Sequence, residues 1–292
     1  FIPRGHQHRP AGRQTGGVTT APMSQHITYS ILGHFATGGM ADLHSIVLND
    51  GQRALLRQLH AAKVFRLGLH RRFRFGLKAR TALSPHEHIV NSLDWGYSGL
   101  RPYEIIEWVE GQNLKNLLNV RSRILADQGL DILTQAATAL AWVHDHGLMH
   151  LDVKPENFIC RSDEDGAITV KLTDFDLARP GDDNGRKRQL GTPAYMAPEQ
   201  FKDKTALMAS DVFAFNVMAY QLLTGKMPFS GETMKKTWRN QASENITARP
   251  PRELVPDLPE KLNRLILRGL AKKPQQRHPD MRAWLHEWKY TL

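Results

Sequence analysis

Three short polar motifs occur in a fixed order in the second half of the chain, and they restrict its fold more than any other feature. The first, HLDVKPEN (150–157), separates a helical apolar stretch from a strand-like one. The second, LTDFDLA (172–178), places Asp174 seventeen residues after Asn157, and the third, GTPAYMAPEQ, follows at 191–200. One such motif could arise by chance, but three in this order and with these gaps point to a single composite site.

The residue types in these motifs suit phosphoryl transfer. Asp152 could accept a proton from a hydroxyl group, and Lys154 could neutralise the group that is transferred. Asn157 and Asp174 offer hard oxygen atoms of the kind that ligate Mg²⁺. Alone, Asp152 and Lys154 would more often be a solvated turn pair, so the interpretation depends on the ordered set.

The composition is ordinary for a globular protein, with 41% hydrophobic and 23% charged residues among 292. A net charge of +10 is compatible with binding to acidic partners such as phosphates or nucleic acid. No aromatic-interleaved basic motif or zinc-ligand spacing supports nucleic-acid binding, so no nucleic-acid partner is expected. The single cysteine, Cys160, excludes a disulfide framework and is expected to be inert and buried. No apolar run is long enough to span a membrane, so we expect a cytoplasmic location.

The local patterns divide the chain into a leader and two lobes. Residues 1–28 are expected to be a disordered leader or upstream extension, because 1–22 contain three Arg, no acid and few apolar residues. Residues 29–109 read as strands with one helix near 69–83, whose apolar face includes Phe73, Leu77 and Ala82. Residues 110–292 are mainly helical, with helices expected near 130–147, 211–224, 232–242, 259–271 and 279–289.

On these motifs the chain resembles the eukaryotic-like Ser/Thr protein kinases of bacterial type, over roughly Tyr29 to Trp288. The resemblance implies an α+β bilobal kinase fold. A small antiparallel β-sheet lobe with one main helix (29–109, including the hinge) would precede a larger, mainly helical lobe (110–292). It also implies ATP and Mg²⁺ as cofactors.

The resemblance assigns roles to individual residues. Asp152 would position and deprotonate the substrate hydroxyl, Lys154 would stabilise the γ-phosphoryl group, and Thr192 would bridge the catalytic loop and favour Ser/Thr acceptors. Asn157 and Asp174 would hold Mg²⁺. Asp211 would brace the catalytic loop, and Glu199 would pair with Arg277. The nucleotide would be lined by Gly38, Gly39, Leu43, Leu55, Arg57, the gatekeeper Ile106, the hinge residues Glu107 and Val109, and Ile159.

The small lobe departs from the family pattern at the phosphates. ATGGMADL keeps only the central pair Gly38-Gly39, with Ala at both outer glycine positions. The phosphate-binding Lys of the family aligns with Arg57; Lys63 is the alternative, but it requires about six extra residues after the loop. Leu55 then replaces a small Ala beside adenine and adds bulk to the pocket.

The helix that normally supplies a Glu to this cation has none. Gly76 aligns with that Glu, and residues 51–86 contain nine Lys or Arg and no Asp or Glu. The usual strand–helix ion pair therefore cannot form. Arg57 stays charged without a partner and can bind phosphate with two hydrogen bonds, and Gly76 is expected to leave room for its larger head group.

Two further departures concern regulation. Leu151 replaces the Arg that receives an activation-loop phosphate, and residues 177–190 contain no Ser, Thr or Tyr, so no phosphorylation switch is expected before Thr192. Asp176 replaces the Gly of the metal-binding triplet, which is expected to restrict a flip of Phe175.

We therefore expect an ATP-dependent Ser/Thr protein kinase that transfers the γ-phosphoryl group to protein hydroxyls. The alternative is a pseudokinase scaffold in signalling, with weak or no nucleotide binding. A small-molecule phosphotransferase is disfavoured, because GTPAYMAPE and Arg277 serve protein substrates in the family. The expected partners are a protein with a Ser/Thr acceptor and an acidic partner at the basic helix Arg71–Arg80.

Overall fold

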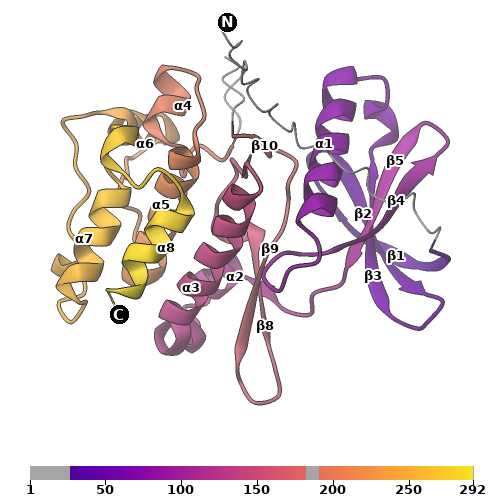
Figure 1. Ribbon diagram of the computed structural model, residues 1–292, viewed down its shortest axis with the longest axis horizontal. Helices are drawn as coiled ribbons and strands as arrows, with labels where there is room; N and C mark the ends of the chain where they lie inside the picture. Colours follow the sequence, from indigo (N-terminus) through magenta and orange to yellow (C-terminus); the bar gives the residue numbers. More distant parts are fainter. Residues whose placement is uncertain (1–26, 182–190, 292) are drawn as a thin grey trace, which may run out of the picture.

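The fold is described from a computed structural model, of which residues 27–181 and 191–291 are described. Two lobes are joined by a single connection, and the small lobe lies on the right of Figure 1. Most of the expected leader and most of the segment 177–190 fall outside the described residues. The predictions that concern them therefore stay predictions.

The small lobe is a five-stranded antiparallel sheet with helix α1 packed beside it (Figure 1). Its strands run in the order β1-β2-β3-β5-β4. Their bounds are β1 Tyr29–Thr37, β2 Ala41–Leu48, β3 Arg53–Leu59, β4 Ser92–Ser98 and β5 Arg101–Glu107, with the 3₁₀ turn η1 Ala61–Lys63 and α1 Leu67–Leu83 between β3 and β4. Side chains alternate along β3, so Ala54 and Leu56 enter the core of the sheet while Leu55 and Arg57 face the other way.

The large lobe is mainly helical and carries two short sheets, β6-β8-β9 and β10-β7. Its helices are α2 Leu114–Asn119, α3 Arg123–Asp145, α4 Pro198–Lys202, α5 Met208–Thr224, α6 Met234–Ala242, α7 Glu260–Gly269 and α8 Met281–Lys289, with 3₁₀ turns η2 Pro155–Asn157, η3 Pro251–Glu253 and η4 Pro274–Gln276. Its strands are β6 Gln112–Asn113, β7 Leu148–Met149, β8 Phe158–Ser162, β9 Ile168–Leu172 and β10 Arg179–Pro180.

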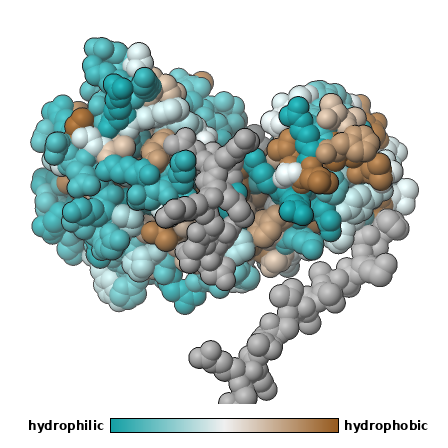
Figure 2. Space-filling model, turned by 90° about the horizontal axis from the view of Figure 1, so that it is seen from above, coloured by the Kyte–Doolittle hydropathy of each residue, from teal (hydrophilic) through white to brown (hydrophobic). Residues whose placement is uncertain are grey.

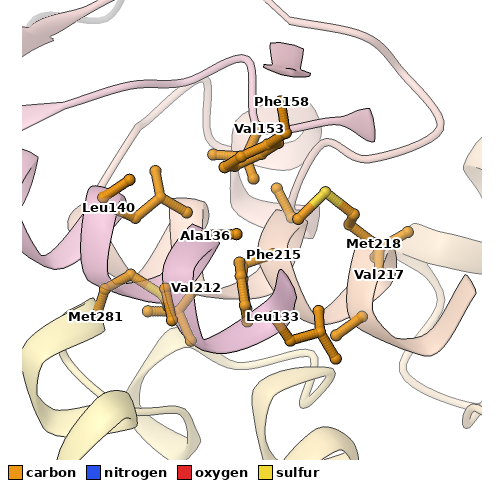
Figure 3. Close-up of a cluster of buried hydrophobic side chains, with 14 of the residues drawn as sticks. Leu133, Ala136, Leu140, Val153, Phe158, Val212, Phe215, Val217, Met218 and Met281 are labelled. Carbon is orange, nitrogen blue, oxygen red and sulfur yellow. The ribbon is translucent and has the colours of Figure 1, made fainter. Parts of the chain in front are cut away.

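The core of the large lobe anchors the loop that contains HLDVKPEN. Figure 3 shows Leu133, Ala136 and Leu140 of α3 facing Val212 and Phe215 of α5. Val153, inside the loop, and Phe158, directly after it, reach the same cluster and are 1% and 0% exposed. The polar residues between them are therefore held against a packed core.

The expected α+β bilobal fold is confirmed, with small differences in the helices. The helix expected at 69–83 is α1, but Ala82 is exposed, so its place on the apolar face was wrong. Because an α-helix has 3.6 residues per turn, the buried face includes Phe73, Leu77 and Arg80 instead. Helix α3 starts at Arg123, before the expected residue 130, and contains a kink at Gln128.

The surface differs between the lobes. Figure 2 shows apolar side chains gathered on the small lobe, whereas hydrophilic ones cover most of the visible large lobe. The most exposed large apolar residues of the small lobe include Phe65, Leu67 and Leu100. Within the described ranges, 27–181 and 191–291, no helix has the length and apolar character that crossing a membrane requires.

Candidate active site

The loop that contains Asp152 is fixed from below by one buried carboxylate. Asp211, in the first turn of α5, is 1% exposed and accepts the backbone N–H groups of His150 and Leu151 at 2.7 and 2.8 Å. His144 lies 3.1 Å from the same carboxylate. These bonds hold Leu151 in a left-handed conformation, with φ of 62°, that a leucine rarely adopts.

Asp152 lies at the centre of a polar cluster that brings together the predicted catalytic residues. Lys154 Nζ donates to Asp152 Oδ2 at 2.7 Å and to Thr192 Oγ1 at 2.9 Å. The Thr192 hydroxyl and backbone N–H both donate to Asp152 Oδ1, at 3.0 and 3.2 Å. Asn157 Nδ2 donates to the Asp152 carbonyl and carboxylate at 2.8 and 3.2 Å. Asp152 is thus an oriented hydrogen-bond acceptor in contact with a cation.

Asn157 and Asp174 fit a divalent cation. Because the Asn157 nitrogen donates to Asp152, the amide oxygen is left as an acceptor. Burial alone would raise the pKa of Asp174, but the positive charge of Arg57 and the hydrogen bond from the Asp176 backbone N–H outweigh it, and the pKa lies below its usual value. Both residues line one cavity, and an ionised carboxylate with an amide oxygen is a donor set that Mg²⁺ accepts.

This cavity, of about 600 Å³, lies between the lobes under β1 and β2. Its lining includes every residue predicted to contact nucleotide or metal, namely Gly38, Gly39, Leu43, Leu55, Arg57, Ile106, Glu107, Val109, Asn157, Ile159 and Asp174. The lining combines apolar side chains, such as those of Leu43, Ile106 and Ile159, with charged ones, such as those of Arg57 and Asp174. A mixed lining of this kind suits a ligand that has an apolar base and charged phosphates.

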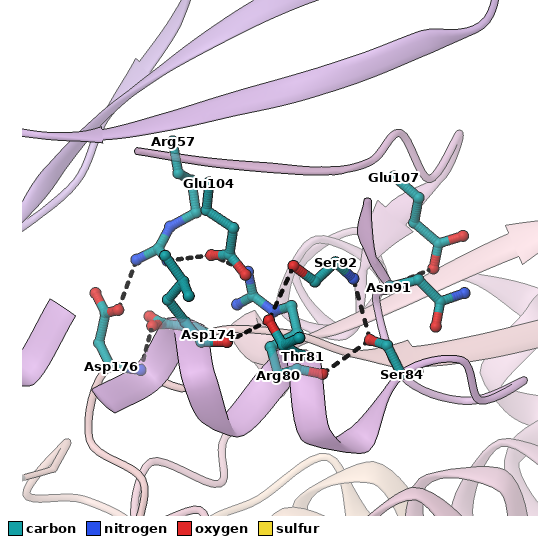
Figure 4. Close-up of polar contacts among 11 residues, drawn as sticks. Arg57, Arg80, Thr81, Ser84, Asn91, Ser92, Glu104, Glu107, Asp174 and Asp176 are labelled. Carbon is teal, nitrogen blue, oxygen red and sulfur yellow. Dashed lines mark hydrogen bonds and ion pairs between the residues drawn. The ribbon is translucent and has the colours of Figure 1, made fainter. Parts of the chain in front are cut away.

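Arg57 makes contacts that the sequence did not reveal (Figure 4). It is 6% exposed, and it donates to Glu104 Oε2 at 3.1 Å and to Asp176 Oδ1 at 2.6 Å. Burial alone would lower its pKa, but Asp176 and Glu104 outweigh this and raise it. A guanidinium has five N–H donors, and these two bonds leave three for another acceptor such as a phosphate.

Glu104 also connects the sheet to α1 (Figure 4). It is fully buried on β5, directly opposite Arg57 in the strand register, and its Oε2 accepts from Arg80 Nη1 at 2.8 Å. Helix α1 therefore contributes a cation, and the carboxylate comes from the neighbouring strand. The signal available in the sequence was an acid inside the apolar stretch PYEII, since a buried charge requires a partner.

Arg80 and Phe175 continue this connection to the catalytic loop. The Arg80 guanidinium lies 5.4 Å from the centre of the Phe175 ring, and that ring packs edge-on against His150 at 5.1 Å. Phe175 is fully buried. Its restricted flip stays a prediction.

Gly76 permits close approach of α1 to the segment that follows β9. A Cβ atom at this position would lie 2.8 Å from the Phe175 carbonyl oxygen and 3.3 Å from Asp176 Cα. The expectation that Gly76 leaves room for the Arg57 head group was therefore wrong: the space is filled by backbone. Arg57 is accommodated because Glu104 and Asp176 take its two Nη atoms.

Replacing Gly76 with Ala should lower the free energy of unfolding by about 1–2 kcal/mol, because the helix must move away from rigid backbone. Gly68→Ala on the same helix is the control: its added Cβ meets nothing within 4 Å, so stability should stay equal or rise by up to about 1 kcal/mol. Urea unfolding of both variants measures this. Equal stabilisation by both would contradict the contact.

Lys63, the alternative phosphate-binding cation, is not part of the cavity lining within the described residues. Its Nζ instead donates to the carbonyl oxygen of Gly39. Farther along the chain, Arg277 holds Glu199 with two bonds of 2.8 and 2.9 Å, at 3% and 4% exposure. This buried pair anchors the segment that begins with Thr192.

Comparison with known proteins agrees with this geometry. A family model described as protein kinase domain matches residues 66–289, a range that begins after β3. A probable serine/threonine-protein kinase of Clostridium acetobutylicum is 31% identical over 219 residues, which cover 74% of this chain and 32% of the relative. The probable serine/threonine-protein kinase PknB of Lactococcus lactis is 29% identical over 263 residues, which cover 87% of this chain and 40% of the relative. Serine/threonine-protein kinase Pkn1 of Myxococcus xanthus is 31% identical over 270 residues, which cover 91% of this chain and 38% of the relative.

The chain spans about a third to two fifths of the length of these relatives. The family match, by contrast, covers most of the chain and includes all three motifs as well as the helix that carries Gly76. The chain therefore belongs to the protein kinase domain family.

Proposed function

We propose that this chain is an active protein kinase that transfers the γ-phosphoryl group of ATP to serine or threonine hydroxyls of a protein substrate. The observation that carries the proposal is the cluster in which Asp152 accepts from Lys154, Thr192 and Asn157 beside the cavity that contains Asp174. These contacts support the proposal, because a carboxylate, a cation and a hydroxyl group already lie within hydrogen-bond distance of one another.

In this mechanism Asp152 orients the substrate hydroxyl and accepts its proton as the oxygen attacks the γ-phosphorus. Lys154 stabilises negative charge on the transferred group, and Thr192 fixes the Asp152 carboxylate. Asn157 and Asp174 would hold Mg²⁺, which supplies positive charge beside the phosphates. Arg57 would bind phosphate oxygens with the donors that Glu104 and Asp176 leave.

The test is incubation of the purified chain with γ-labelled ATP, Mg²⁺ and a generic protein substrate, followed by phosphoamino acid analysis. Label on phosphoserine or phosphothreonine supports the proposal. The absence of transfer, together with no rise in melting temperature on addition of Mg-ATP, would instead favour the pseudokinase scaffold.

An acidic partner at the basic helix also stays a proposal. Arg71 and Arg72 of α1 line a second cavity, of about 410 Å³, together with Arg179. Burial lowers the pKa of Arg72, and its Nε has no hydrogen-bond partner among the described residues. A polyglutamate peptide should bind the chain and lose affinity with Arg72→Gln, but not with Arg74→Gln on the exposed face.

A further inference from the structure

The turn that carries Gly38 and Gly39 is held from outside the cavity by one short segment. His60 Nε2 lies 2.9 Å from the Gly38 carbonyl oxygen, Lys63 Nζ donates to the Gly39 carbonyl, and the His60 backbone N–H donates to the Met40 carbonyl at 3.1 Å. Three consecutive carbonyl groups of the turn are therefore engaged by residues 60–63.

The planarity of the peptide group determines where the opposite ends of these peptides point. In a trans peptide the N–H group points away from the preceding carbonyl. Because the carbonyls of Gly38 and Gly39 face residues 60–63, the N–H groups of Gly39 and Met40 face away from that segment. Gly38, Gly39 and Met40 line the 600 Å³ cavity, whereas His60 and Lys63 do not. Two adjacent N–H groups on the cavity side form a binding arrangement for an anion.

His60 is itself anchored by a carboxylate. Its Nδ1 lies 3.0 Å from Asp42 Oδ2, and Arg101 lies 3.8 Å from the same oxygen. The two ring nitrogens thus lie beside the Asp42 carboxylate and the Gly38 carbonyl oxygen, and these two contacts fix the orientation of the ring. The hydrogen bond to His60 accordingly lowers the pKa of Asp42.

We propose that His60 and Lys63 are positioning residues that turn the Gly39 and Met40 peptides so that their N–H groups bind the phosphates of the nucleotide. This inference rests on the proposed function. It accounts for a phosphate loop that works with only its central glycine pair, because side-chain bonds replace the conformational control that the outer glycines would give. Lys63 thus contributes to phosphate binding through the backbone and not through its own charge.

The test compares two ligands in the double variant His60→Ala with Lys63→Met. Mg-ATP affinity, measured by calorimetry, should fall roughly tenfold, since two positioning hydrogen bonds are lost. The affinity for adenosine, which has no phosphates, should change less than about twofold. Lys78→Met, on the exposed face of α1, is the control and should leave both affinities unchanged.

Several outcomes would overturn the inference. An equal loss of affinity for Mg-ATP and for adenosine would show a general collapse of the cavity. An unchanged Mg-ATP affinity would show that the two side chains do not position the turn. His60→Gln keeps a donor for the Gly38 carbonyl. If His60→Gln combined with Lys63→Met recovers none of the Mg-ATP affinity that the double variant loses, the proposal is also wrong. A parent chain that binds no Mg-ATP would refute the proposed function itself.

Discussion

Replacing Asp152 with Asn should lower kcat for phosphoryl transfer by about 10³-fold, with a moderate fall in melting temperature because Lys154 loses its carboxylate partner. Asn has the same shape, but it cannot take the hydroxyl proton, and a positioned base typically accounts for a factor of this size. The Asp152 carboxylate accepts from three side chains, so the substitution also places an amide among donors. Initial rates at saturating Mg-ATP measure the effect.

The matched control is Asp163→Asn. Asp163 lies in the exposed turn after β8 and pairs with Arg161 on the surface. The kcat of the Asp163→Asn variant should therefore equal that of the parent. If the Asp152→Asn chain keeps a tenth or more of the parent rate, Asp152 does not have the proposed role as proton acceptor. Loss of folding is distinguished by the melting temperature of the two variants.

Replacing Glu104 with Gln should destabilise the chain by about 3–5 kcal/mol, the cost of removing one partner from a buried ion pair. Glu104 is fully buried and its Oε2 accepts from both Arg57 and Arg80. In the variant, Arg57 keeps Asp176 at 2.6 Å, but Arg80 loses its carboxylate while 1% exposed. The free energy of unfolding from urea titrations gives the magnitude.

Glu232→Gln provides the control for this substitution. Glu232 forms an exposed pair with Lys236 on the large lobe, and its replacement should change stability by less than about 1 kcal/mol. If Glu104→Gln costs no more than Glu232→Gln, the buried network does not couple the sheet to α1. Rescue by the apolar pair Glu104→Leu with Arg80→Leu would support it, because no charge is then left unpaired in α1.

Local sequence was sufficient to predict the large-lobe motifs and their loop. Asp152, Lys154 and Asn157 lie within six residues, and their positions follow from the helix before them and the strand after them. Glu199 and Arg277 are 78 residues apart, so local sequence could not predict their pair; the family resemblance predicted it. The roles of the site residues stay proposals, although the structure brings them to one cavity and one cluster.

The small-lobe network could not be predicted because it depends on pairing between distant strands. The contact of Glu104 with Arg57 follows from the β3–β5 register, and that of Arg80 follows from the rotation of α1 against the sheet. Residues 51–86 contain no Asp or Glu, and the carboxylate that pairs with Arg57 and Arg80 lies outside this range, at Glu104. Gly76 was misread for the same reason, since the backbone that fills its space comes from a segment about 100 residues later.

Arg57 is proposed to bind phosphate while Glu104 and Asp176 hold its guanidinium group in the cavity. Calorimetric titration of Mg-ATP into the parent and into Arg57→Ala measures this contribution. Arg57→Ala leaves Glu104 paired with Arg80 but removes the cation that Asp176 contacts, so the melting temperature of the variant is measured beside its affinity. The parent should bind Mg-ATP, and the variant should bind it roughly 10–100-fold more weakly, the range for charge-assisted hydrogen bonds. Equal affinities, or no binding by the parent, would contradict this role of Arg57.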